Sequence, residues 1–276
     1  MPTVPADLEP LASKSAVTGF DLASVDAGGD HTCGLTKDGQ AYCWGNNFSG
    51  QLGDGTTMHR DVPVPVAGGL AFTSLSTGDH NGCGLTRDGQ AYCWGQNFYG
   101  QLGNGMRTDS NVPVPVAGGI AFASLSLGAF HTCGVTKDRK GYCWGWNDFY
   151  GELGNGTSMN SDVPVPVSGG LAFTFVGLGH FFSCGATKDR EAYCWGNNVA
   201  GALGTAAPLE PCGGFVGSAP DLLRGCSRLP VPVDGGLGIR REVAQHLDVR
   251  VPSAHEDQAL HGRGPRTKSP NQAVAL

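Results

Sequence analysis

The chain is poor in charge and acidic overall. Only 15% of its 276 residues are Asp, Glu, Lys or Arg, and the formal net charge is −6. Proteins that bind nucleic acids usually present a basic patch or stripe to the phosphate backbone. The composition therefore predicts that the chain has no nucleic-acid partner.

Long apolar segments are also missing. No run of about 18 apolar residues occurs, and residues 1–18 lack the basic start and the apolar centre of a signal peptide. We therefore expect no membrane span, and no export signal is visible in the sequence.

Catalytic motifs are missing as well. The sequence has no Gly-Lys-Ser/Thr phosphate-binding loop, no His-Glu-x-x-His helix and no Ser-His-Asp arrangement. The acidic residues fall mainly in turn-like segments. We therefore expect that the protein is not an enzyme, and that it uses no catalytic residues, no cofactor and no metal ion.

Glycine, in contrast, is abundant, and much of it lies in a passage that recurs along the chain. There are 45 glycines, and the passage, which spans 31–45 in its first copy, occurs four times. Its first cysteine recurs at Cys33, Cys83, Cys133 and Cys184, in steps of 50, 50 and 51 residues. A period near 50 with strand and turn patterns is typical of propeller blades. We predict an all-β fold, a β-propeller of four-stranded blades in about four repeats that form a partial or open ring.

The cysteines are spaced with a regularity that a β-hairpin explains. Eight of the ten form four pairs, with nine residues between the partners. If Lys37–Gly39 is a three-residue loop whose glycine is left-handed, Thr36 faces Gln40 and Cys33 faces Cys43. Facing cysteines at a non-hydrogen-bonded pair are close enough for a disulfide.

Two interpretations of the cysteines remain open. In one, they form cross-strand disulfides in a secreted or otherwise extracytoplasmic protein. In the other, they are reduced and serve as small core residues in a cytoplasmic protein. The disulfide candidates, which include a wider fifth pair, are Cys33, Cys43, Cys83, Cys93, Cys133, Cys143, Cys184, Cys194, Cys212 and Cys226.

Each repeat carries apolar side chains on both faces of its central hairpin. Cys33 and Leu35 alternate onto one face, while Tyr42 and Trp44 take the other. A single sheet cannot bury both faces, but blades stacked face to face can. We therefore expect the Trp and Tyr of every repeat to be core residues, with Gly34 leaving space for the ring of Tyr42. The proline-rich fourth strand, such as 112–116, is expected at a sheet edge.

A histidine opens the recurring passage in only two of its copies. His31 and His131 occupy this position in the first and third copies, whereas Asn81 and Phe182 replace it in the second and fourth. A position that changes to Phe cannot be a ligand that every blade requires. We interpret the histidine as a hydrogen-bonded structural residue.

Two segments of the repeat carry a family resemblance. Ala27–Leu35 reads Ala-Gly-Gly-Asp-His-Thr-Cys-Gly-Leu, and Trp44–Gly53 reads Trp-Gly-Asn-Asn-Phe-Ser-Gly-Gln-Leu-Gly. Both resemble signatures of the regulator of chromosome condensation repeat family, over roughly Phe20 to Leu237. The resemblance implies a propeller, typically of seven four-stranded blades, that presents its loops to protein partners. The additional cysteines and the Pro-Val-Pro-Val strand are similar to the bacterial branch of the family.

These features lead to one hypothesis of function and two alternatives. We expect a non-enzymatic β-propeller module that binds protein partners through its inter-strand loops, with self-association through open blade faces. The first alternative is a guanine-nucleotide exchange factor for a small GTPase, which the family resemblance implies. The second is a fragment of a larger bacterial cell-surface repeat protein. The candidate partner contacts, taken from loops in which the repeats differ, are Phe48, Met58, His59, Arg60, Phe98, Arg107, Asp109 and Phe149.

The repeats also predict the domain organisation. A lead-in of 1–19 precedes the propeller repeats of 20–237, and a tail of 238–276 follows. The tail contains no Cys, Trp, Tyr or Phe, so it is expected to be disordered or the product of an aberrant gene model. The expected repeat boundaries are 20–69, 70–119, 120–170 and 171–237.

Overall fold

The computed structural model describes residues 19–148, 150–204 and 231–232. The chain divides into two compact units, Met1–Gly235 and Gly236–Leu276, and every described residue belongs to the first. The predicted pair Cys212 and Cys226 and the candidate contact Phe149 lie outside the described residues, as do the predicted lead-in up to residue 18 and the predicted tail.

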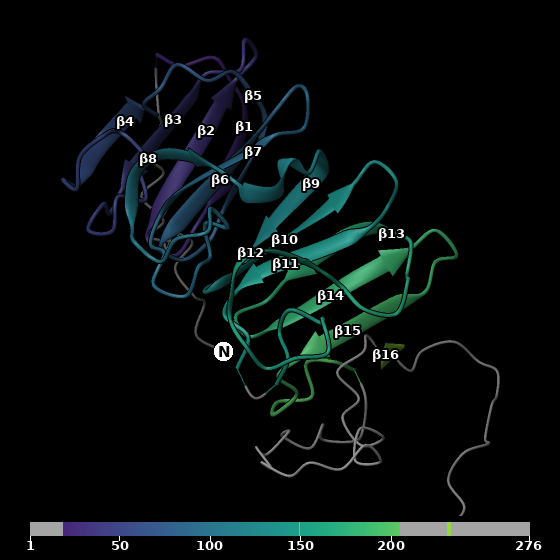
Figure 1. Cartoon of the computed structure of the whole chain (residues 1–276). Helices are drawn as coiled ribbons and strands as arrows, with labels where there is room; N and C mark the ends of the chain where they lie inside the picture. The colour runs from purple at the N-terminus through teal and green to yellow at the C-terminus, as the bar shows by residue number, and fades with distance from the viewer. Residues whose placement is uncertain (1–18, 149, 205–230, 233–276) are drawn as a thin grey trace, which may run out of the picture. The chain divides into compact units, whose positions relative to one another are not determined.

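The described chain forms four antiparallel sheets, each of four strands that follow one another in sequence order (Figure 1). This arrangement confirms the predicted all-β propeller with four-stranded blades. The only helical element described is the short 3₁₀ turn η1 (Ala117–Gly119). No described helix has the length and apolar character needed to cross a membrane.

The strands recur with the period expected from the sequence. The first blade holds β1 (Leu22–Ala27), β2 (His31–Thr36), β3 (Ala41–Gly45) and β4 (Arg60–Pro65). The second holds β5 (Phe72–Thr77), β6 (Asn81–Thr86), β7 (Ala91–Gly95) and β8 (Ser110–Pro115). The third holds β9 (Phe122–Leu127), β10 (His131–Thr136), β11 (Gly141–Gly145) and β12 (Ser161–Pro166). The fourth holds β13 (Phe173–Leu178), β14 (Phe182–Thr187), β15 (Ala192–Gly196) and β16 (Val231–Pro232).

The central hairpin of each blade has the predicted register. Gly39 has a φ of +90°, the N–H of Thr36 donates to the carbonyl of Gln40, and Cys33 lies opposite Cys43. The two Cα atoms of this cysteine pair are 4.1 Å apart, which is typical of a non-hydrogen-bonded antiparallel pair. The four described pairs are disulfides, and they are Cys33–Cys43, Cys83–Cys93, Cys133–Cys143 and Cys184–Cys194.

Neighbouring blades pack face to face, and each interface has the same composition. The disulfide face of one blade contacts the tryptophan face of the next. Between the second and third blades, Cys83 and Leu102 lie in one buried cluster with Phe122 and Trp144. The first and third interfaces repeat this pairing. The expectation that blades bury one another's faces is therefore confirmed.

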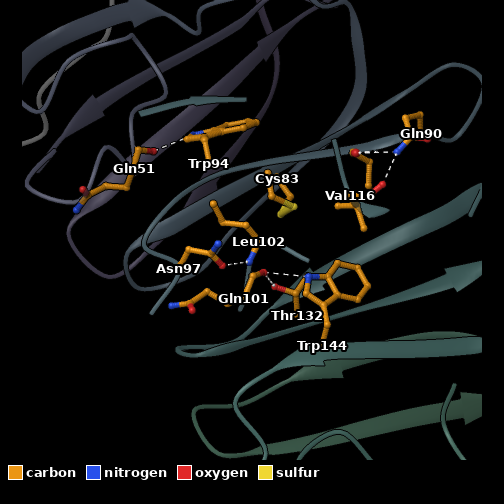
Figure 2. Close-up of a disulfide and its surroundings, with 12 residues drawn as sticks. Gln51, Cys83, Gln90, Trp94, Asn97, Gln101, Leu102, Val116, Thr132 and Trp144 are labelled. Atoms are coloured by element: carbon orange, nitrogen blue, oxygen red, sulfur yellow. Dashed lines mark hydrogen bonds between the residues drawn. A yellow bond between two sulfur atoms is a disulfide. The ribbon is translucent and has the colours of Figure 1, made fainter. Parts of the chain in front are cut away.

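A directional hydrogen bond joins each tryptophan to the preceding blade. The indole Nε1 of Trp144 donates to the carbonyl of Gln101 over 2.9 Å, and Trp94 makes the same bond to Gln51 (Figure 2). Both indoles are fully buried. Trp44 is only half-buried, because no earlier blade covers its face within the described part of the chain. The prediction that every repeat Trp is a core residue is thus wrong for Trp44.

The space beside the strand glycines is filled by side chains other than the Tyr that the sequence predicted, and beside Gly34 this side chain is Leu22. A Cβ atom on Gly84 would overlap the ring of Phe72, which comes from the first strand of the same blade. Tyr92, the residue opposite Gly84, is half-buried. The sequence prediction assigned this space to the Tyr of the hairpin, but a neighbouring strand supplies the Phe that occupies it.

The fourth strand lies at the edge of its sheet, as its prolines predict. β8 pairs only with β7, with Pro115 opposite Tyr92 and Val114 opposite Cys93. Proline has no N–H for a second ladder, so an edge position removes the need for one.

The loop that follows the third strand is built around a buried asparagine. In the second blade, Asn97 Oδ1 accepts the N–H of Leu102, and its Nδ2 donates to the carbonyls of Met106 and Thr108. Asn97 and Leu102 are both fully buried. The amide therefore fixes the loop that carries the acceptor carbonyl for the next tryptophan (Figure 2).

The hairpin disulfides are the first testable feature. An oxidised sample should show the four described pairs by peptide mapping without reduction. Replacing Cys83 and Cys93 together by Ala should lower the free energy of unfolding by about 2–3 kcal/mol, because a short covalent loop no longer restricts the unfolded chain. Free thiols at these positions, or scrambled partners, would contradict the assignment.

Candidate functional site

Six aromatic rings gather at one end of the second, third and fourth blades. They form a continuous set of ring contacts, and Phe98 is 67% exposed. We call this set the aromatic cluster, and its members are Phe98, Tyr99, Phe130, Trp146, His180 and Phe181.

Antiparallel pairing explains why residues so far apart in sequence meet. The turn before β10 and the loop after β11 lie at the same end of the third blade, so Phe130 and Trp146 are neighbours. The corresponding turn of the fourth blade brings His180 and Phe181 to this end, and the loop after β7 brings Tyr99. Face-to-face packing of the blades then places the three groups side by side.

Trp146 and Tyr99 form the centre of the aromatic cluster. Their ring centroids are 4.6 Å apart, and Trp146 lies 5.2 Å from Phe130 and 5.6 Å from Phe181. His180 stacks on Phe181 at 4.7 Å. Contacts of this length are within the range of favourable aromatic pairs, so the rings support one another although they are partly exposed.

The outer end of the cluster is anchored by an ionisable pair. His180 Nε2 lies 3.0 Å from Asp79 Oδ2, which comes from the turn between β5 and β6 in the second blade. This contact joins the fourth blade to the second at the edge of the rings.

A groove opens beside the two central rings. It has a volume of about 490 Å³, and Tyr99 and Trp146 form part of its wall. Arg107 and Asp148 contribute charges to the wall, and Met159, which is 75% exposed, contributes an apolar rim. The groove therefore combines flat apolar surfaces with a few polar groups of both signs.

The cluster forms where the repeats differ from one another. The first blade has Asp30, Asn46 and Ser49 at the positions that Phe130, Trp146 and Tyr99 occupy in later blades. Of the six cluster residues, Phe98 alone is among the contacts predicted from the sequence. An aromatic residue that replaces a polar one at the same repeat position is the signal that would have found the cluster.

The predicted partner contacts are divided between two regions. Phe98 belongs to the aromatic cluster, and Arg107 lines its groove, 3.8 Å from Asp162. Phe48 packs against His59 in the first blade, with ring centroids 4.2 Å apart. Among the described residues, no ring contact joins this first-blade pair to the cluster.

Several predicted contacts hold their own loops. His59 Nδ1 accepts the backbone N–H of Asn47, and Asp109 accepts the equivalent N–H in the second blade. Arg60 Nε donates to Asp54 over 2.9 Å. Met58 is exposed beside them. These polar residues have a structural use that the sequence did not reveal.

The two repeat histidines are buried, but only one has the expected hydrogen bond. His131 Nε2 lies 2.9 Å from Ser183 Oγ of the next blade. Neither ring nitrogen of His31 has a hydrogen-bond partner among the described residues, because Gly82 stands where Ser183 stands in the fourth blade. Burial lowers the pKa of both histidines to about 4, so both are neutral near pH 7.

A buried carboxyl group lies in the loop that carries Trp146. Gln51 donates from its Nε2 to Asn46 in the first blade, but the third blade has Glu152 and Trp146 at these positions. Oε2 of Glu152 is buried without a hydrogen-bond partner among the described residues, and burial raises the pKa of this carboxyl to about 7. The nearby Asp148 charge raises the pKa further.

This carboxyl generates a pH-dependent prediction. Its pKa is higher in the folded chain than in the unfolded chain, so its ionisation costs stability as pH rises from about 4.5 to 7. Glu152→Gln should raise the free energy of unfolding by roughly 1–3 kcal/mol at pH 8 and change it little at pH 4.5. Chemical denaturation at the two pH values measures the difference.

A matched control places the same charge in the second blade. Gln101→Glu should destabilise the chain more at pH 8 than at pH 4.5, since Gln101 is buried like Glu152. Equal effects of Glu152→Gln at both pH values would rule out the buried carboxylate as the cause.

Solved structures similar to this chain share its fold. Human WBSCR16 is 22% identical, with a TM-score of 0.66 over 80% of this chain and 55% of that one. Yeast RCC1 (Prp20), in a crystal structure with Kap60, is 22% identical, with a TM-score of 0.63 over 80% and 50%. Prp20p from Saccharomyces cerevisiae is 21% identical, with a TM-score of 0.61 over 80% of this chain and 52% of that one. The chain thus spans about half the length of these structures.

Family models match the repeats directly. Two models described as the regulator of chromosome condensation (RCC1) repeat match the chain. The first matches each of the four blades, and the second matches two longer segments that cross from one blade into the next. The matched residues are 23–51, 72–101, 122–151 and 173–202 for the first model, and 38–85 and 88–135 for the second. The chain belongs to the regulator of chromosome condensation repeat family.

Proposed function

We propose that this chain is a non-enzymatic protein-interaction module that binds its partner through the aromatic cluster. The observation that carries the proposal is the concentration of aromatic rings at positions where an otherwise uniform repeat differs. A uniform repeat supplies a rigid scaffold, and the differences between repeats supply specificity. The cluster and its groove form such a difference over three blades.

The chemistry of the cluster supports a protein partner. Tyr, Trp, Phe, Met and Arg are enriched in the cores of protein interfaces, where rigid rings bury a large area at low entropic cost. Trp146 and Tyr99 supply the rings, and Arg107 and Met159 lie beside them. The net charge of −6 disfavours a nucleic acid at this surface.

The disulfides support an extracytoplasmic setting. Four cross-strand bonds persist best in an oxidising compartment. We infer a secreted or cell-surface protein, which fits the bacterial type of repeat. If the chain is instead a piece of a larger bacterial cell-surface protein, its surroundings differ, but the proposed binding surface is the same.

Swaps between repeats test the binding surface with little risk to the fold. Trp146→Asn and Tyr99→Ser restore residues that the first blade already uses at these positions. Each should weaken binding of a purified partner by at least about tenfold, because loss of a central aromatic contact typically costs 2 kcal/mol or more. The partner is first identified by comparing quantitatively which proteins the wild-type chain and the variants capture. The affinity of the purified partner is then measured by calorimetry.

Phe48→Ser is the matched control, since Phe48 is an exposed ring of the first blade outside the aromatic cluster. It should leave the affinity unchanged. A partner whose affinity depends on Phe48 but not on Trp146 or Tyr99 would place the binding surface elsewhere.

The alternative of nucleotide exchange has a separate test. One similar structure is described by its binding to Gsp1p and histones, but at 21% identity this likeness carries the fold alone. We predict no acceleration of fluorescent-nucleotide release from small GTPases, because no described residue departs from the repeat as a group positioned for that reaction. Release well above the intrinsic rate, lost on deletion of 205–229, would favour the exchange factor.

A further inference from the structure

The three interfaces between described blades share one set of contacts. In each, a tryptophan Nε1 donates to a loop carbonyl of the preceding blade over 2.9 Å. The donor and acceptor pairs are Trp94 with Gln51, Trp144 with Gln101, and Trp195 with Glu152.

A glycine in the acceptor loop makes room for each indole. A Cβ on Gly103 would lie 2.6 Å from Nε1 of Trp144. Gly53 lies in the same way against Trp94, and Gly154 against Trp195. The φ angles are +65° for Gly53, +67° for Gly103 and +62° for Gly154, and all three fall in the left-handed region. Only a loop of this shape can therefore receive the tryptophan of a following blade.

The fourth strand of the following blade also touches the same loop. A Cβ on Gly50 would lie 2.6 Å from the Cα of Asn111, and the N–H of Gly55 donates to the carbonyl of Asn111. Gly100 has the same close neighbour in Asp162. The first two interfaces thus consist of an indole and an edge strand docked on one glycine loop.

The fourth blade presents the same loop over its described residues, which end at Gly204. The N–H of Leu203 donates to Asn198 Oδ1 over 2.9 Å, and the N–H of Gly204 donates to the carbonyl of Gly201. Leu203 is fully buried, as its counterparts are. Ala202, at the position of the acceptor Gln101, is exposed, and a Cβ on Gly201 would meet no atom within 4 Å.

The first blade presents the other half of the same interface. Trp44 is half-buried, and its Nε1 has no hydrogen-bond partner among the described residues. Val25 on the same face is 57% exposed, whereas Val176, its counterpart inside the third interface, is 4% exposed. An apolar face of this kind is one that soluble proteins usually cover.

We propose that a second copy of this chain covers these faces in a head-to-tail contact. Trp44 of one copy packs over the Gly201–Gly204 loop of the other, and its indole N–H donates to the carbonyl of Ala202. The edge strand β4, through Asp61, packs beside Gly201 as Asn111 packs beside Gly50. The contact is heterologous, so it either closes into a ring of copies or continues into longer assemblies.

The internal interfaces favour a second copy of the chain as the molecule that covers these two faces. Both halves of a working interface are present on one chain, and their shapes are already matched to each other in three internal examples. None of the residues in this contact belongs to the aromatic cluster. The inference therefore goes beyond the proposed function, and either can fail without the other.

Sedimentation velocity over a range of concentrations tests the proposal on the full oxidised chain. The wild-type chain should associate with concentration, and Trp44→Arg should weaken association by at least about tenfold. Gly201→Asn should do the same, since Asn tolerates the left-handed backbone while its side chain occupies the position of the docked strand. Phe48→Ser is the control and should associate as the wild type does.

Mixing the two variants gives the decisive result. Trp44→Arg retains the loop of the fourth blade, and Gly201→Asn retains Trp44, so an equal mixture should form one-to-one dimers that neither variant forms alone. Circular dichroism and thermal unfolding check that both variants are folded. A wild-type chain that stays monomeric at about 100 μM, well above the dissociation constants of micromolar contacts, would overturn the proposal. A mixture that stays monomeric would overturn it equally.

Discussion

The hydrogen bond from a tryptophan indole to the loop carbonyl of the preceding blade is the interaction on which the rest of the structure depends. It joins the apolar disulfide face of one blade to the apolar tryptophan face of the next. Trp144 can reach Gln101 because Gly103 leaves no side chain beneath the ring, and the buried amide of Asn97 holds the loop in place. Loop, glycine and tryptophan thus act together, and a blade without a neighbour has little to stabilise it.

This contact also has a direction, because every blade has one tryptophan face and one disulfide face. A stack built from such units ends in two different surfaces. Trp44 and the Gly201–Gly204 loop are the described examples at the two ends. The same asymmetry leaves a tryptophan face on the first blade and an acceptor loop on the fourth.

Variation between repeats is tolerated where the backbone carbonyl and the glycine of this contact are kept. Trp146 and Tyr99 replace polar residues of the first blade within the acceptor loops, and Phe130 does so in the turn before β10. The backbone carbonyl that accepts the indole N–H and the glycine beneath the ring are kept. Glu152 shows the local cost of such a change. Its backbone carbonyl still accepts the Trp195 indole, but its side chain has lost the amide partner that Gln51 finds, and burial raises the pKa of its carboxyl to about 7.

The sequence by itself determined the blade, because the blade is made by local rules. A three-residue turn with Gly39 sets the register that pairs Cys33 with Cys43, and the four copies of the recurring passage correspond to the four blades described. Only the tertiary structure decided which ring fills the space beside Gly84, which histidine finds a partner, and that Phe130, Trp146 and Phe181 meet. These outcomes depend on the distance between blades and on which side chain of the next blade lies opposite. Residues some 50 positions apart become neighbours only after the faces have packed.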